Sequence, residues 1–323
     1  MTRALTIKPL ADNTALEVGG IDLDRPLDAD ARKALYEAFV QAGILVFPRT
    51  GISPEAHLAL SRCFGELQRH PVKENWAEFY PELVDISYRP GHEGESSVAL
   101  YEVDGQSRGG WLPWHSDLRY MSRINRGGIL RAIRTPREGG RTGFIDQIAA
   151  YATLPEPLTQ RIDGLHVVYQ LRPDFTQETF GKPESLKLIA NAAALDAMAG
   201  RIEQDFPPVV HPMVYVQAET GRKVLNVSPT SAVGILEMPG RDGDTLLEEV
   251  LSYALNPALT YWHDWQENDL VLWDNWRTLH SAEGVPEDCV REMQRTTIAG
   301  DYALGRLLSD FETGRHDRPA DAL

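Results

Sequence analysis

The sequence contains little cysteine: its 323 residues include only Cys63 and Cys289, and no CxxC pair. Two cysteines cannot form the disulfide framework of a small secreted protein, and without a CxxC pair a cysteine-based zinc site is excluded. Neither cysteine has a paired base nearby in the sequence, which argues against thiol catalysis. Any metal ion must therefore be bound by histidines and carboxylates.

Long apolar runs are also absent. No segment approaches the roughly 20 apolar residues of a membrane span, and the N-terminal MTRALTIKPLADN lacks the apolar core of a signal peptide. Neither a GxSxG motif nor a phosphate-binding glycine loop is present. We expect a cytoplasmic protein with no membrane partner.

Basic residues are in the minority. The 32 lysines and arginines face 47 acidic residues, which gives a net charge of −15. Nucleic acid is not an expected partner, because neutralising phosphates requires a positive surface. The same negative field repels small anions, so an anionic substrate would need a few locally placed cations to capture it.

The rest of the composition is that of a globular chain. Hydrophobic residues make up 42% and charged residues 24%, and proline and glycine are spread along the whole length. We predict one domain over residues 1–323. Apolar spacing predicts a helix from Asp28 to Gly43 and a buried strand over Ile44–Phe47. A second helix follows, with Ser53 as its cap and Gly65 at its end.

From about residue 98 the pattern changes to short apolar or alternating runs separated by glycine, proline and aspartate. A hairpin is predicted over 213–217 and 223–227, and a helix over 244–255. Many short strands with few helices predict a mainly β fold with flanking helices, as a sandwich or barrel. The polar segment 172–208 is predicted to be a lid over the barrel mouth, and 304–323 a variable tail.

One histidine has a carboxylate at a spacing that could hold a metal. In WLPWHSDLRYM, His115 and Asp117 are two residues apart, so on an extended strand both side chains project from the same face. The pair alone is weak support for a metal site, since an exposed strand pair would give the same pattern.

The C-terminal half supplies a third candidate ligand and two cations. His280 follows the strand-like run NDLVLWDN, and Arg291 and Arg295 follow it in VREMQRTTIAGD. On an extended segment both arginines share a face, which is costly to bury unless an anion neutralises them. A solvated edge strand paired with nearby acids is the alternative interpretation.

Two histidines and one carboxylate are the donor set of non-haem Fe(II) oxygenases, which leave three positions of an octahedral ion open. A 2-oxo acid cosubstrate fills two of these positions and dioxygen the third. The far carboxylate of the cosubstrate then needs a cation and a neutral donor. Arg291 is our candidate for the cation, and Thr142 in EGGRTGFID for the donor.

These motifs together resemble the TauD/TfdA family of Fe(II)- and 2-oxoglutarate-dependent dioxygenases. The matching pieces are FGELQRHP at 64–71, WHSD at 114–117, GGRT at 139–142, HP at 211–212, WDNWRTLH at 273–280, and the two arginines beyond. The resemblance extends roughly from the ILVF strand to Asp301.

The resemblance implies a double-stranded β-helix, or jelly-roll barrel, with the iron at its open end. It implies that His115, Asp117 and His280 are the catalytic metal ligands. Thr142 and Arg291 would bind the distal carboxylate of 2-oxoglutarate, and Arg295 would meet the cosubstrate or an anionic substrate head. It also implies a homo-oligomer, either a dimer or a tetramer.

The implied reaction consumes dioxygen and 2-oxoglutarate, releases succinate and carbon dioxide, and hydroxylates an unactivated C–H bond of a small organic anion. Hydroxylation next to a heteroatom makes the product fall apart, which is how family members cleave C–O or C–S bonds. The substrates expected are aryloxyalkanoate-like carboxylates, or sulfonates and sulfate esters.

Several residues near the motifs are candidates for substrate binding. His70 stands where family members use a histidine against the anionic group of the substrate. Lys73 and Trp111 replace the tyrosine and asparagine of the taurine-cleaving members, so we predict that taurine is not the substrate. Leu118 is a further candidate, and Tyr120 with Trp111 and Trp114 could form an aromatic wall.

A rival function from another class is a barrel that holds a divalent ion such as zinc and binds a small organic acid without redox chemistry, because these ligands alone do not select the metal. The arginine pair with Thr142 favours the oxygenase, since a simple binding barrel needs no anchor for a second carboxylate.

Overall fold

The computed structural model describes residues 5–10, 15–23, 25–51, 53–92, 96–198, 200–301 and 303–312. The chain is mainly β, with strands in several sheets and helices on their flanks, as the sequence predicts. Within the described ranges, no helix has the length and apolar character needed to cross a bilayer.

The largest sheet has seven strands and contains the one predicted strand near the N-terminus. In spatial order its strands are β1 (Thr6–Leu10), β2 (Ala15–Gly19), β3 (Ile44–Phe47), β17 (Leu270–Asp274), β8 (Gly127–Arg134), β20 (Arg291–Thr296) and β4 (Leu83–Tyr88). Facing it is a four-stranded sheet of β16 (Thr260–His263), β9 (Thr142–Asp146), β18 (Thr278–Ala282) and β7 (Leu112–His115).

Two further sheets have four strands each, and a two-stranded hairpin completes the β structure. The first contains β15 (Ala232–Ile235), β10 (His166–Tyr169), β12 (Val209–Pro212) and β21 (Arg306–Leu307). The second contains β11 (Lys187–Ala190), β5 (Leu100–Val103), β6 (Gln106–Gly109) and β19 (Val285–Pro286). The hairpin is β13 (Val214–Val216) with β14 (Lys223–Leu225), within the segment predicted for it.

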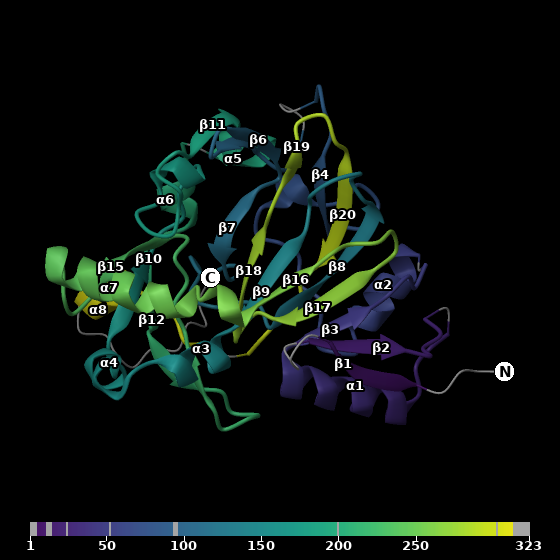
Figure 1. The fold of residues 1–323 in the computed structure, drawn as a ribbon, viewed down its shortest axis with the longest axis horizontal. Helices are drawn as coiled ribbons and strands as arrows, with labels where there is room; N and C mark the ends of the chain where they lie inside the picture. Colours follow the sequence, from purple (N-terminus) through teal and green to yellow (C-terminus); the bar gives the residue numbers. More distant parts are fainter. Residues whose placement is uncertain are drawn as a thin grey trace.

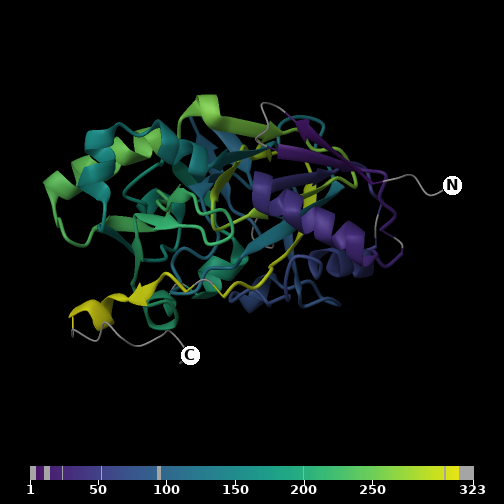
Figure 2. The ribbon, with the colours of Figure 1, turned by 90° about the horizontal axis from the view of Figure 1, so that it is seen from below.

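In Figures 1 and 2, α1 and α2 lie on one flank of the strands, α3, α4 and α7 lie near β10 and β15 on the opposite flank, and α5 and α6 lie near β11. Their bounds are α1 Ala29–Ala42, α2 Pro54–Ser61, α3 Gln147–Thr153, α4 Glu156–Ile162, α5 Ala193–Met198, α6 Ile202–Asp205, α7 Arg241–Ala254 and α8 Leu308–Glu312. Short 3₁₀ helices are η2 Lys73–Asn75, η4 Phe175–Gln177 and η5 Pro257–Leu259.

The predicted ends of α1 are confirmed by its capping contacts. The Asp28 side chain accepts a hydrogen bond from the Ala31 backbone N–H at 2.8 Å. At the other end Gly43 has φ 78°, a left-handed conformation that favours glycine, and its N–H donates to the Phe39 carbonyl.

Two other helix predictions needed correction at their ends. The second helix was predicted to run to Gly65, but α2 ends at Ser61. Beyond it, the N–H groups of Cys63 and Phe64 donate to the carbonyls of Leu60 and Ser61, three residues back, which is the tighter 3₁₀ pattern. The helix predicted over 244–255 is α7, which begins three residues earlier at Arg241.

The predicted lid, residues 172–208, contains regular structure. It includes η4, β11, α5 and α6, and β11 pairs with β5. Of the predicted tail, residues 304–312 form β21 and α8, with β21 paired to β12. Residues 313–323 lie outside the described residues.

A hydrophobic core joins the seven-stranded sheet to the sheet that contains β7 and β18. The large sheet contributes Ile44, Leu130, Val271, Trp273 and Met293, and the facing sheet contributes Phe144 with Trp265 packed beside it. Trp273 and Phe144 are among the largest fully buried side chains of the protein. This core fixes β18 and β9 against β20, so residues at the ends of these strands keep fixed relative positions.

Candidate functional site

Two of the predicted ligands lie on neighbouring strands. His115 ends β7 and His280 is the middle residue of β18, and the antiparallel register places them directly opposite each other. Opposed side chains on one face of an antiparallel pair are close neighbours. Their rings are 4.0 Å apart between centroids, at an angle of 45°.

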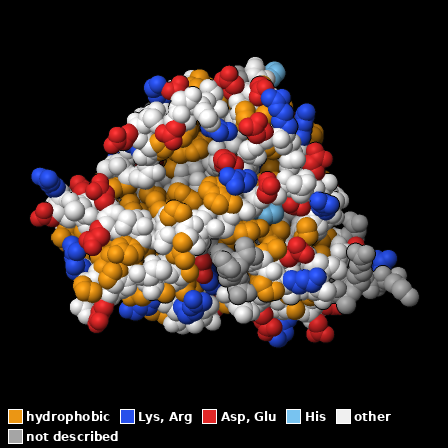
Figure 3. Space-filling model, viewed as in Figure 1, with side chains coloured by type: hydrophobic (Ala, Val, Ile, Leu, Met, Phe, Trp, Pro, Cys, Tyr) orange, Lys and Arg blue, Asp and Glu red, His pale blue; other side chains and the backbone are white. Residues whose placement is uncertain are grey.

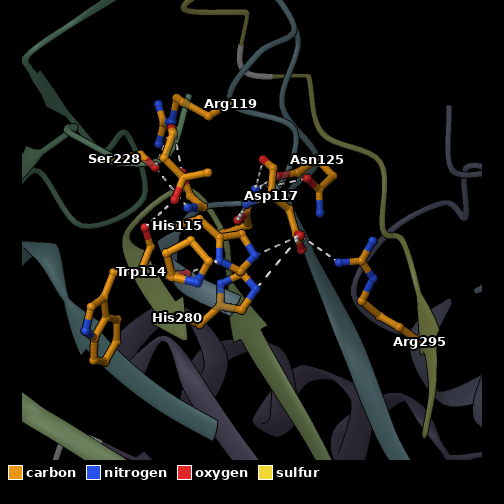
Figure 4. Close-up of polar contacts among 12 residues, drawn as sticks. Trp114, His115, Asp117, Arg119, Asn125, Ser228, His280 and Arg295 are labelled. Atoms are coloured by element: carbon orange, nitrogen blue, oxygen red, sulfur yellow. Dashed lines mark hydrogen bonds and ion pairs between the residues drawn. The ribbon is translucent and has the colours of Figure 1, made fainter. Parts of the chain in front are cut away.

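Asp117 completes the cluster, from the turn that follows β7. Its Oδ1 is 3.9 Å from His115 Nε2 and 3.8 Å from His280 Nε2. Asn275 fixes the backbone of Asp117 from both sides: Asn275 Oδ1 accepts from the Asp117 N–H at 2.7 Å, and Asn275 Nδ2 donates to the Asp117 carbonyl at 2.9 Å. Figure 4 shows the two imidazoles and the carboxylate converging.

The protonation states of the cluster follow from its burial and contacts. Burial lowers the pKa of His115 and that of His280, so both rings are neutral near pH 7. Burial also opposes ionisation of Asp117, but the charge and hydrogen bond of Arg295 outweigh it and hold the pKa of Asp117 well below its usual value. The site therefore presents two neutral imidazoles and one carboxylate.

Hydrogen bonding selects the tautomer of His115. Its Nδ1 lies 2.8 Å from the Pro113 carbonyl, which can only accept, so Nδ1 carries the proton and Nε2 offers its lone pair toward Asp117. Phe144 stacks on the His280 ring with centroids 6.1 Å apart. These contacts fix both rings before any ligand binds.

The three residues fit a divalent metal ion. One ligand atom from each of His115, Asp117 and His280 lies within 4.8 Å of the other two. Asp117 Oδ2 and His280 Nδ1 are buried and have no hydrogen-bond partner among the residues that the structure describes. A buried carboxylate oxygen without a donor is costly unless a cation neutralises it, and this donor set is the one that Fe(II) accepts in non-haem oxygenases.

Arg295 makes a contact that the sequence did not predict. Its Nη1 donates to Asp117 Oδ1 at 2.6 Å, from β20 of the opposite sheet (Figure 4). Without a metal ion, this guanidinium is the strongest partner of the carboxylate. Its Nε is buried and lacks a partner within the described chain, so the guanidinium retains capacity for a further acceptor.

Arg291 and Thr142 lie on facing strands, with Arg291 on β20 and Thr142 on β9. A Cβ added to Gly140, two residues before Thr142, would lie 3.4 Å from Arg291 Cδ, so that segment passes close to the arginine. The Nε and Nη2 atoms of Arg291 are buried with no partner in the described residues. Burial lowers the pKa of Arg291 to about 10, so it remains a cation near pH 7.

The hydroxyl of Thr142 is held by a residue that the sequence analysis missed. The indole N–H of Trp265 donates to Thr142 Oγ1 at 2.9 Å. Because the oxygen accepts this bond, the hydroxyl proton is free to be donated to another acceptor. Neither Trp265 nor Asn275 was assigned a role, although Asn275 lies within the WDNW motif.

A cavity of about 230 Å³ opens beside the cluster. Of the predicted substrate residues, the structure brings four to this cavity, together with His115 and Asp117: His70, Leu118, Tyr120 and Arg295. Burial lowers the pKa of His70 to about 4. Its Nδ1 accepts from the Val72 N–H at 3.2 Å, so its Nε2–H is left as a donor.

Two predicted substrate residues do not line this cavity. Lys73 lies on η2 with an exposed side chain. Trp111 packs instead against Tyr101 and Phe175, with ring centroids 5.8 and 6.2 Å away. Trp114 likewise packs on Trp262. Tyr120 is thus the one member of the predicted aromatic wall among the lining residues.

Comparison with known proteins gives consistent results over most of the chain. The family model described as "Taurine catabolism dioxygenase TauD, TfdA family" matches residues 6–297. The (S)-phenoxypropionate/alpha-ketoglutarate-dioxygenase of Sphingobium herbicidovorans is 30% identical over 309 residues, which cover 96% of this chain and 100% of the relative.

A second relative and a solved structure agree with this match. The alpha-ketoglutarate-dependent 2,4-dichlorophenoxyacetate dioxygenase of Cupriavidus pinatubonensis is 30% identical over 305 residues, covering 93% of this chain and 100% of the relative. The crystal structure of a putative alpha-ketoglutarate-dependent taurine dioxygenase from Burkholderia xenovorans superposes with a TM-score of 0.70 at 27% identity, covering 92% of this chain and 90% of that one.

Proposed function

Because the chain belongs to the taurine catabolism dioxygenase TauD, TfdA family, we propose that His115, Asp117 and His280 hold its Fe(II) ion and that its substrate is an aryloxyalkanoate-like carboxylate. The chain is a 2-oxoglutarate-dependent dioxygenase, and its cosubstrates are 2-oxoglutarate and dioxygen. The observation that carries the ligand assignment is the convergence of three ligand atoms within 4.8 Å.

We assign the far carboxylate of 2-oxoglutarate to Arg291 and Thr142. Arg291 is a buried cation with unused donors, and the Thr142 hydroxyl is oriented by Trp265. An arginine fork and a hydroxyl donor suit a carboxylate, and their burial strengthens the electrostatic attraction. The two residues thereby set the orientation in which 2-oxoglutarate reaches the iron.

When bound, Fe(II) supplies the redox chemistry that couples decarboxylation of 2-oxoglutarate to oxidation of a substrate C–H bond. The protein supplies the geometry. The Pro113 carbonyl and Asn275 fix His115 and Asp117, and the buried position of His280 excludes water from that side of the site.

We assign the carboxylate of the substrate to Arg295 and His70. Arg295 Nη1 donates to Asp117 Oδ1, and the other donors of this guanidinium, including the buried Nε that has no partner in the described residues, would bind the substrate carboxylate. The neutral His70 ring adds an N–H donor. Apolar lining residues such as Val84, Ile86 and Leu171 suit the organic body of the acid.

The relatives support an aryloxy acid as the substrate. The two relatives described above are named for phenoxypropionate and 2,4-dichlorophenoxyacetate. Hydroxylation of the carbon attached to the ether oxygen of such an acid gives a hemiacetal that breaks the C–O bond. Sulfonates and sulfate esters also carry an anionic head group and are the second class to test.

The fold and assembly are part of the proposal. We infer that the seven-stranded sheet and the sheet of β16, β9, β18 and β7 form a double-stranded β-helix within one domain, closed over by the lid 172–208. We expect a cytoplasmic homo-oligomer, a dimer or tetramer, that binds neither nucleic acid nor membranes. On the face in Figure 3, acidic and basic side chains are interspersed among the coloured atoms, with no continuous basic area.

The ligand assignment is tested by loading the anaerobic protein with Fe(II) and 2-oxoglutarate. We expect the weak visible charge-transfer band of the complex, and succinate release in air with an aryloxy acid. Asp117→Ala removes the only carboxylate of the ligand set and should abolish both signals. His166→Gln, on β10 outside the cavity, is the matched control and should retain them.

The same experiment separates the rival function. A folded, metal-binding protein that gives no band and no succinate with any acid would be a non-redox binding barrel. Turnover of taurine as fast as of phenoxyacetate would contradict the proposed substrate class.

A further inference from the structure

The cavity beside the metal ligands contains an acidic side chain that the reaction described above does not use. Glu178 lies in the lid, directly after η4, and its side chain lines the cavity. It is only 4% exposed. Removing a carboxylate from water is costly unless partners compensate, so a buried acid at this position calls for a physical reason.

Three carboxylates line the cavity, and Glu178 differs from the other two in its partners. Asp117 accepts from Arg295, and Asp85 Oδ1 accepts from the Gln294 side chain at 3.0 Å. Among the described residues, Glu178 Oε2 accepts from the backbone N–H of Ser231 alone, at 2.7 Å. Across the described part of the chain, no cation lies within ion-pair distance of Glu178, and Arg172 and Lys182 act on it from further away.

The backbone at Ser231, which makes this contact, has an unusual conformation. Ser231 has φ 65°, a left-handed conformation that is uncommon for residues other than glycine. Its carbonyl accepts from the Gln170 N–H at 2.8 Å, and the residue is buried. Sparsely populated conformations persist where the surrounding structure enforces them, and they concentrate at binding sites. The Glu178 carboxylate is therefore held at a fixed position on the cavity wall.

Glu178 and Arg295 lie on different walls of the cavity. Arg295 projects from β20 of the seven-stranded sheet, whereas Ser231 directly precedes β15 of another sheet. Figure 4 shows Arg295 approaching Asp117 from the side opposite to Ser228, three residues before Ser231. The other lining residues are mainly apolar, including Val72, Leu112 and Leu195.

A ligand in this cavity thus meets Arg295 on one wall, apolar side chains in the middle and Glu178 on another wall. We propose that Glu178 determines specificity by binding a hydrogen-bond donor, a hydroxyl or a protonated amine, that the substrate carries away from its acid group. This inference rests on the proposed function, since it takes Arg295 and His70 as the residues that bind the acid. Burial raises the pKa of Glu178 to about 7, as expected for a buried carboxyl without a cation in contact.

The test uses three acids that differ only at the position remote from the carboxylate: phenoxyacetate, 4-hydroxyphenoxyacetate and 4-(aminomethyl)phenoxyacetate. Their affinities for the anaerobic protein with Fe(II) and 2-oxoglutarate are measured by calorimetry, and their turnover by succinate release. We expect the wild-type protein to bind at least one donor-bearing acid about ten- to a hundredfold more tightly than phenoxyacetate, as for a hydrogen bond to a charged group.

Two variants identify the donor. Glu178→Gln keeps an acceptor for the Ser231 N–H but loses the charge, so it should remove a preference for the amine and retain much of one for the hydroxyl. Glu178→Leu should remove both preferences. Glu184→Gln alters an exposed acid of the same lid and should leave the affinities unchanged.

The results distinguish this inference from the proposed function. Equal affinities of the wild-type protein for all three acids, no binding of any of them, or a preference that survives in Glu178→Leu would overturn the role of Glu178. The charge-transfer band reports separately on the iron and 2-oxoglutarate site. Its absence would contradict the proposed function, whereas its presence in all variants confirms that they fold.

Discussion

The hydroxyl of Thr142 illustrates how a single residue is prepared for binding. A threonine hydroxyl can donate one hydrogen bond and accept two, and in water it rotates among them. The indole N–H of the buried Trp265 donates a hydrogen bond to Thr142 Oγ1, so the hydroxyl proton of Thr142 must point toward another acceptor. The His263 ring packs edge-on against Trp265 with centroids 4.4 Å apart, which keeps the indole in place. If Thr142 binds the cosubstrate as proposed, Trp265 is its positioning residue.

Replacing Trp265 with phenylalanine should weaken binding of 2-oxoglutarate by about five- to tenfold, the cost of one neutral hydrogen bond. The measurement is titration of the anaerobic Fe(II) protein with 2-oxoglutarate. Trp262→Phe, on the exposed part of β16, is the matched control and should change the affinity little. If Thr142→Val weakens binding equally with and without Trp265→Phe, the two residues act independently and the positioning role is wrong.

At this scale the sequence predicted the residues that carry distinctive chemistry. The spacing of His115 and Asp117 was weak support by itself, and the family resemblance added His280; the structure brings all three together. Lys73 and Trp111 were expected at the cavity because they replace a tyrosine and an asparagine of taurine-cleaving family members, but Lys73 is exposed and Trp111 packs against Tyr101 and Phe175. Glu178 carries no signal in the sequence, since its burial depends on the contact with Ser231, which is 53 positions away.

At the scale of secondary structure, Arg277 links strand β18 to the start of α3 and the end of α1. It lies one residue before β18, which carries His280, and forms an ion pair with Asp146 at the end of β9. Asp146 also caps α3 by accepting from the Ile148 N–H at 3.0 Å. Arg277 Nη1 donates to the Val40 carbonyl in the last turn of α1 at 3.0 Å. One guanidinium therefore holds a helix start, a helix end and a strand together.

Arg277→Met should lower the free energy of unfolding by about 3–5 kcal/mol, because it leaves the carboxylate of Asp146 without its cation in a mostly buried position. Urea denaturation measures the change. The control is Arg161→Met, which removes the exposed pair of α4 with Glu249 and should cost less than about 1 kcal/mol. Equal losses in the two variants would show that Arg277 contributes no more than a surface pair.

The elements themselves were predicted best where a local signal exists. The caps of α1 and the hairpin of β13 and β14 depend on residues close in sequence, and both are confirmed. The lid was predicted as an irregular excursion, because the short runs that form β11, α5 and α6 have weak periodicity. Pairing of β11 with β5, more than 80 positions away, is what orders that segment, and such contacts cannot be read from local patterns.

At the scale of the whole molecule, many histidine side chains are buried and uncharged. Burial lowers the pKa of five of them: His57, His70, His115, His211 and His280. Of these, His115 and His280 belong to the proposed metal ligand set, and His57 and His211 instead donate to the carbonyls of Ile129 and Met121 within the fold. Each of these rings must gain a proton against burial when the pH falls, so the folded state as a whole is expected to be sensitive to acid.

His57 allows this sensitivity to be measured apart from the site. Its pKa is lowered to about 4 in the folded protein, whereas an unfolded chain takes up the proton near 6.5. Between these values the unfolded state binds more protons, so stability is full above about pH 6.5 and is lost as the pH falls toward 4. The loss from this one residue is about 3 kcal/mol.

His57→Gln keeps a donor for the Ile129 carbonyl but cannot be protonated, so it should reduce the fall in unfolding free energy between pH 7 and 4.5 by about 2–3 kcal/mol. The stabilities are measured by urea denaturation with a chelator present, so that metal release does not contribute. The exposed His92 provides the control, since His92→Gln should leave the difference between the two pH values nearly as in the wild-type protein. An unchanged acid sensitivity in His57→Gln would mean that the ring is already charged in the fold or shielded by a partner, contrary to its burial beside the backbone of β8.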